Sequence, residues 1–122
     1  MKRAILLIDH GSRREEANEL LERVADQIRV RAPESIVETA HLEIAEPDIA
    51  EGIDACVKRG ATQIVVHPYF LGPGRHTSED IPAQVERARE RHPNIRIRIS
   101  EPLGGHAALV EAILDRVSDA DH

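Results

Sequence analysis

Residues 4–12, AILLIDHGS, decide the fold. Five apolar residues in an unbroken run predict a strand that is covered on both faces. Ser12 and Glu15 have the S-x-x-E spacing of a capping box, which predicts that a helix begins just after Gly11. The stretch therefore predicts a strand followed at once by a helix, with a histidine at the point where one gives way to the other.

Three further strands are expected along the chain. Residues 64–66 (IVV) are also continuously apolar, whereas residues 35–43 (SIVETAHLE) and 95–99 (IRIRI) alternate apolar with polar side chains. Continuous runs suit central strands and alternating runs suit edge strands, so the first and third strands should lie in the middle of the sheet. The expected strand order is 2-1-3-4.

Amphipathic segments follow each strand. The first helix has the i, i+3, i+4, i+7 pattern of apolar residues. Pro47 suits the first turn of a second helix that Gly60 caps, and Pro82 would be tolerated only in the first turn of a third. The apolar positions that outline the four helices are Ala17, Leu20, Leu21, Val24, Ala25 and Ile28; Ile49, Ile53, Cys56 and Val57; Ile81, Val85 and Ala88; and Leu109, Ala112, Ile113 and Val117.

The alternation of strands and helices predicts the fold class α/β. Right-handed crossovers give three layers, with helices on both faces of a four-stranded parallel sheet. One domain is expected over residues 1–118, and residues 119–122 are expected to fray. In such sheets ligands bind beyond the carboxyl ends of the strands, at the switch point, which here lies between the first and third strands.

Composition narrows the class of protein. The net charge of −6 argues against a nucleic-acid or membrane-surface binder, because such proteins need excess Lys and Arg. The short apolar run after Lys2 and Arg3 has no cleavage signal, so neither a signal peptide nor a membrane span is expected. The single cysteine, Cys56, falls on an apolar helix position, and a cytoplasmic location is the default expectation.

Three distant segments bring chemically active side chains to the predicted mouth of the sheet. His10 follows the first strand, Glu43 ends the second, and the loop after the third contains Arg75 and His76. Two imidazoles and a carboxylate can bind a divalent metal and leave coordination positions open. His41 and His67 are closer in character to strand residues, although either could contribute to such a site.

Simpler interpretations of these residues stay open. Ser12 fits a helix N-cap, and His10 fits a hydrogen-bonded turn histidine. Arg13 and Arg75 could be solvated surface or could meet an anionic ligand. The sequence has no phosphate-binding G-x-x-x-x-G-K-[ST] loop and no G-x-G-x-x-G, and it has almost no aromatic residues, so no nucleotide and no flavin cofactor is expected.

Four ordered blocks resemble the small class II chelatases, the sirohydrochlorin chelatases. They are LLIDHGSR, AHLEIAEPDI, VVHPYFLGPGRHTSEDIP and EPLGGHAALVEAILDRV, and together they cover nearly the full length. The resemblance implies one half of a chelatase-like, flavodoxin-like fold. It also implies ATP-independent insertion of Fe²⁺ or Co²⁺ into sirohydrochlorin, for siroheme or cobalamin biosynthesis, with Ni²⁺ or Zn²⁺ accepted in vitro. The members that it resembles work as homodimers.

The resemblance also assigns roles to individual residues. It implies that His10 and His76 bind the metal, with Glu43 as the active-site glutamate. Ser12, Arg13 and Arg75 are not assigned by the resemblance, but their positions flank the mouth and make them candidate contacts for the carboxylates of such a substrate. His67 is an extra ligand or a local variant.

Two other classes of protein compete with this interpretation. A histidine phosphatase is disfavoured because Asp9, directly before His10, would repel phosphate. A non-enzymatic metal carrier or sensor could use the same histidine pair. Tight metal binding without tetrapyrrole binding would favour the carrier.

Overall fold

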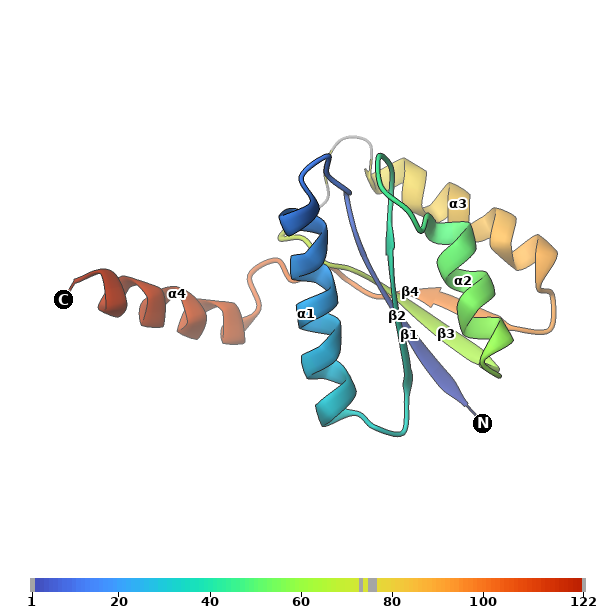
Figure 1. The fold of residues 1–122 in the computed structure, drawn as a ribbon, viewed down its shortest axis with the longest axis horizontal. Helices are drawn as coiled ribbons and strands as arrows, with labels where there is room; N and C mark the ends of the chain where they lie inside the picture. Colours follow the sequence, from blue (N-terminus) through green and yellow to red (C-terminus); the bar gives the residue numbers. More distant parts are fainter. Residues whose placement is uncertain (1, 73, 75–76, 122) are drawn as a thin grey trace.

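The computed structural model describes residues 2–72, 74 and 77–121, and it contains the expected alternation of strands and helices (Figure 1). The elements in chain order are β1 (Arg3–Asp9), α1 (Glu15–Arg31), β2 (Ile36–His41), α2 (Ile49–Lys58), β3 (Gln63–Pro68), α3 (Thr77–Arg91), β4 (Arg96–Ile99) and α4 (Ala107–Ala120).

The four strands form one parallel sheet in the order β2-β1-β3-β4, as the sequence predicts. Figure 1 shows α1 on one face of the sheet and α2 with α3 on the other. The larger core lies under α2 and α3, and Leu6, Ile8 and Val66 are fully buried there. A smaller core under α1 contains Leu7, Leu21, Ala25 and Val37. The three-layer α/β architecture is therefore confirmed.

The start of α1 differs from the sequence prediction. The helix begins at Glu15, with Arg14 as the N-cap and no side-chain cap. The Ser12 hydroxyl oxygen instead accepts a hydrogen bond from the backbone N–H of Arg14 at 3.0 Å, while the Asn18 amide bonds both backbone groups of Ser12. The capping-box prediction is wrong, because Ser12 closes a turn one residue before the helix rather than the helix itself.

Two proline positions were also predicted wrongly. Pro47 precedes α2, whose N-cap is Asp48 and whose capping box pairs Asp48 with Glu51. Pro82 lies inside α3, beyond the first turn. Gly60, with a φ of 98°, follows the last residues of α2 as expected for a helix end.

The fourth helix points away from the sheet (Figure 1). None of its residues is buried, and Val110, Ile113, Leu114 and Val117 expose between 49% and 60% of their surface. The helix continues to Ala120, so part of the tail that was expected to fray is helical. These four apolar side chains of α4 are thus left without a cover in the single chain.

No helix among the described residues is both long enough and apolar enough to cross a membrane.

Candidate functional site

Backbone pairing between β1 and β2 continues past the ends of both strands. The N–H of Leu42 donates to the carbonyl of Asp9 at 2.8 Å, and the N–H of Glu43 donates to the carbonyl of His10 at 3.1 Å. These bonds bring His10 and Glu43, which are 33 positions apart in the sequence, into direct contact at the carboxyl edge of the sheet. The prediction that these two segments meet is therefore confirmed, while their role in metal binding stays a prediction.

Gly11 allows this close approach. Its φ is 90°, and a Cβ atom at this position would lie 1.9 Å from the carbonyl oxygen of Glu43. A side chain here would both strain the backbone and push the Glu43 segment away. Glycine is therefore required for the chain to leave β1 directly beside Glu43.

Asp9 and His41 form a hydrogen-bonded pair beneath the edge. The Nδ1 atom of His41 lies 2.5 Å from Oδ1 of Asp9, which also accepts a bond of 3.0 Å from the N–H of Gly11. His41 is only 5% exposed. His41 therefore supports the Asp9–Gly11 turn from below, with one ring nitrogen already engaged, and it does not lie on the exposed rim.

The His10 side chain is exposed and stacks on the ring of Phe70, with centroids 4.8 Å apart and an interplanar angle of 30°. Phe70 follows β3, and the adjacent N–H of Tyr69 donates to the carbonyl of Ile8 at 2.6 Å. His10 thus lies between the end of β2 and the end of β3. The sequence assigned no role to Phe70, although it is the only phenylalanine in the chain.

His67 has a separate environment. Its Nδ1 atom lies 2.7 Å from the Ser100 hydroxyl, and burial lowers the pKa of the imidazole from its ordinary value. In the sheet it pairs with Leu7, so both lie on the α1 face. His67 is therefore a half-buried residue of β3, and no contact joins it to His10 or Glu43 within the described part of the chain.

The remaining predicted site residues are only partly described. Arg13 is exposed, and Ser12 is half-buried with its hydroxyl oxygen bonded to the N–H of Arg14. Arg75 and His76 lie outside the described residues. Within residues 2–72, 74 and 77–121, no group of three or more His, Cys, Asp or Glu side chains could hold a metal ion. The metal role of His76 thus stays a prediction.

Ile44 is a feature of the edge that sequence reasoning missed. Its φ is 73°, and the N–H of Ala45 donates to the carbonyl of Glu43 at 2.8 Å, which closes a three-residue turn around Ile44. A left-handed conformation is rare for a β-branched residue. No sequence signal indicated it, because neither glycine nor asparagine occupies the position.

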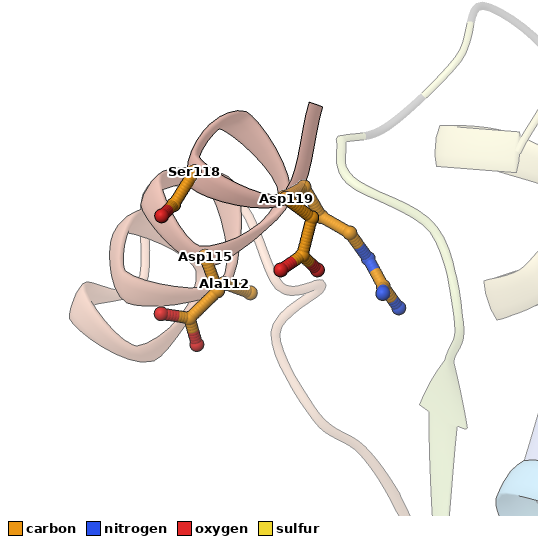
Figure 2. Close-up of a pocket in the computed structure, with 5 residues that line it drawn as sticks. Ala112, Asp115, Ser118 and Asp119 are labelled. Carbon is orange, nitrogen blue, oxygen red and sulfur yellow. The ribbon is translucent and has the colours of Figure 1, made fainter. Parts of the chain in front are cut away.

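A separate hollow of about 450 Å³ lies on α4. Figure 2 shows Ala112, Asp115, Ser118 and Asp119 around it, and Arg116 completes the lining. All five residues belong to the helix that leaves the sheet, and none lies at the edge where His10 and Glu43 meet. This hollow is therefore distinct from the predicted site.

Comparison with known proteins identifies the family. The CbiX family model matches residues 4–120. A sirohydrochlorin cobaltochelatase from Methanocaldococcus jannaschii is 31% identical over 137 aligned positions, covering 93% of this chain and 96% of that protein. The chain therefore belongs to the CbiX family, the sirohydrochlorin chelatase family that the four sequence blocks predict.

Two longer proteins are also similar. A chloroplastic sirohydrochlorin ferrochelatase from Arabidopsis thaliana is 42% identical over 113 residues, which are 93% of this chain and 50% of that protein. A crystal structure of the sirohydrochlorin chelatase SirB from Bacillus subtilis subspecies spizizenii in complex with cobalt has a TM-score of 0.89 and 38% identity, covering 98% of this chain and 51% of that one. The chain thus spans about half the length of these two relatives.

Proposed function

We propose that this chain inserts Fe²⁺ or Co²⁺ into sirohydrochlorin without ATP, for siroheme or cobalamin biosynthesis. The observation that carries the proposal is the contact between the His10 and Glu43 segments at the switch point of a CbiX-family fold. The relatives named as ferrochelatases and cobaltochelatases, and the cobalt complex of SirB, support iron or cobalt as the metal substrate.

The chemistry exchanges two pyrrole N–H protons for one divalent metal ion. In this proposal His10, together with His76, binds the metal through neutral imidazole nitrogens, and Glu43 assists binding or accepts a proton. His10 is exposed and Glu43 is exposed beside it, so both can meet a planar ligand that approaches from solvent. A site with only a few protein ligands would hold the metal weakly enough to release it to the tetrapyrrole.

The substrate is a polycarboxylate, whereas the protein has a net charge of −6. Arg13 and Arg75 would provide local positive charge at the mouth. The Ser12 oxygen accepts a bond from the Arg14 N–H, which leaves the hydroxyl hydrogen to donate to a substrate carboxylate.

The test is anaerobic absorbance spectroscopy of sirohydrochlorin with Fe²⁺ or Co²⁺. We expect the wild-type protein to accelerate metal insertion, and we expect His10→Ala and His76→Ala to lower the rate by more than about tenfold. His92→Ala is the matched control, because His92 bonds Asp54 at 2.8 Å on a different part of the fold. No acceleration by the wild type would sink the proposal, and metal binding without tetrapyrrole binding would identify a carrier.

We also propose that the chain pairs with a second copy through α4. The apolar stripe of Val110, Ile113, Leu114 and Val117 is uncovered in the single chain. On the α1 face of the sheet, α1 contacts β1 and β2, while Arg96 and Arg98 of β4 stay exposed. The acidic Glu111 and Asp115 of α4 complement these arginines in charge.

Sedimentation equilibrium tests the pairing. Leu114→Glu should convert a dimer to a monomer, because it places a charge in the stripe that the pairing would bury, whereas Val30→Glu should not, since Val30 is 81% exposed on α1. A wild-type protein that sediments as a monomer, or a Leu114→Glu variant that remains a dimer, would refute this arrangement.

A further inference from the structure

Ile44 is held in a conformation that its side chain opposes. Among the described residues it is the only one other than glycine with a positive φ. The turn around it, closed by the bond from Ala45 N–H to the Glu43 carbonyl, is the γ-turn with positive φ, which is the rare and strained form. Glycine would adopt this backbone without a steric penalty.

The interior of the protein gains nothing from isoleucine at this position. The Ile44 side chain is 63% exposed and belongs to neither hydrophobic core. A β-branched apolar side chain that is strained, largely exposed and outside both hydrophobic cores of the described residues adds little packing to offset the strain. Strain of this kind is concentrated at functional sites, where a side chain must be presented to a ligand.

The surroundings of Ile44 indicate which ligand this is. Glu43, the preceding residue, bonds the backbone of His10, and the His10 ring stacks on Phe70 on the β3 side. Ile44 follows β2, so it lies on the other side of His10 from Phe70. Leu71, next to Phe70, is 65% exposed. The predicted metal ligand is thus flanked by apolar side chains from both neighbouring strand ends.

We propose that Ile44 is a substrate-binding residue whose side chain packs on the flat carbon face of the tetrapyrrole, beside the proposed metal ligand His10. This inference rests on the proposed function. A tetrapyrrole is apolar over its ring face and anionic at its periphery, so an exposed aliphatic group complements the ring while arginines meet the carboxylates. The contact exists equally before and during metal insertion, and its loss therefore weakens binding rather than slowing chemistry.

The experiment compares Ile44→Gly, Ile44→Ala and Ile44→Leu with the wild type. For each protein it measures kcat and KM for sirohydrochlorin with Co²⁺, the Kd for metal-free sirohydrochlorin by absorbance titration, the Co²⁺ affinity, and Tm. Val30→Ala is the control, since it shortens an aliphatic side chain on α1 that is even more exposed than Ile44, at 81% against 63%.

Ile44→Gly should raise KM and Kd for sirohydrochlorin roughly fivefold, because a partly buried aliphatic contact is lost. Its kcat and Co²⁺ affinity should stay within about twofold of the wild type, and its Tm should be equal or higher because the strain is relieved. Ile44→Ala should show a similar rise, whereas Ile44→Leu, which keeps the apolar bulk, should bind as the wild type does. Val30→Ala should leave KM unchanged.

An unchanged KM and Kd in Ile44→Gly would overturn the inference while leaving the chelatase function intact. A Leu variant that binds as poorly as the Gly variant would also overturn it, because the side chain's apolar area would then not be the cause. If the wild type fails to accelerate metal insertion, the proposed function itself is wrong, and this result is distinguishable from the other two.

Discussion

Within the β1–α1 unit, Leu6 and Gly11 are five residues apart and lie in regions that differ in kind. Leu6 is fully buried on the face of β1 that α2 covers, and it belongs to the larger hydrophobic core. Gly11 lies at the edge, where Gly11 and Ile44 both have a positive φ and where Asp9 bonds the buried His41. The core is thus organised for packing, and the edge presents particular side chains to solvent.

The largest effect on stability is expected in the core. Leu6→Ala should lower the free energy of unfolding by about 2–5 kcal/mol, because it leaves a cavity against α2. The residue of α2 that faces Leu6 is Gly52, which has no side chain to fill that cavity. Chemical denaturation measures this loss. The folded Leu6→Ala protein should keep the wild-type kcat. A large change in kcat under conditions where the variant is fully folded would show that core and edge are not independent.

Gly11→Ala should lower the free energy of unfolding somewhat less than Leu6→Ala does, but it should also displace Glu43 at the carboxyl edge of the sheet. Gly60→Ala is its matched control, since the φ values of 90° and 98° are similar, but a Cβ atom at Gly60 would meet nothing within 4 Å. Backbone strain alone should cost Gly60→Ala about 1 kcal/mol of unfolding free energy, and Gly11→Ala about 2–3 kcal/mol because the Glu43 carbonyl must also move.

Metal-insertion rates separate these two glycine variants further. Gly11→Ala should lower kcat because it displaces Glu43 from His10, while Gly60→Ala should not. Equal losses of stability and activity in the two variants would mean that the close approach at Gly11 has no special role.

The smallest expected effect is the contribution of His67 to the pH dependence of stability. His67 is half-buried at the end of β3, and burial lowers its pKa from the ordinary value, so the unfolded chain binds a proton more readily than the folded one. The stability that the neutral His67 contributes is present above the unfolded pKa of about 6.5 and is lost progressively as the pH falls below that value and through the lower pKa of the folded state. Urea denaturation at pH 7.5 and 5.5 should therefore show a smaller pH dependence for His67→Gln than for the wild type. An equal dependence would remove His67 from this account.

Much of the core was predictable from sequence because periodicity reports burial directly. The unbroken runs at residues 4–8 and 64–66, set against the alternating runs at 35–43 and 95–99, were enough to order the four strands. The same pattern failed to locate α4, since an apolar stripe predicts a helix but not the surface that covers it. The start of α1 was misplaced because Ser12 has two ways to satisfy nearby N–H groups, and Asn18 favours the turn.

The edge was predictable only in part. The topology rule brought His10 and Glu43 together correctly, because the carboxyl ends of parallel strands share one edge. The strain at Ile44 and the stacking of Phe70 on His10 had no sequence signal, since both depend on contacts between segments that are remote in the chain.

The most direct test of the central claim is NMR of the ¹⁵N-labelled protein during titration with Co²⁺, whose paramagnetism shifts and broadens nearby signals. We expect the signals of His10, Glu43 and Ile44 to change first, while those of the Asp54–His92 pair and of the acidic hollow at Asp115 and Asp119 remain unchanged. Changes centred on either of the latter groups, with the His10 signals intact, would contradict the claim that the carboxyl edge of the sheet is the metal site.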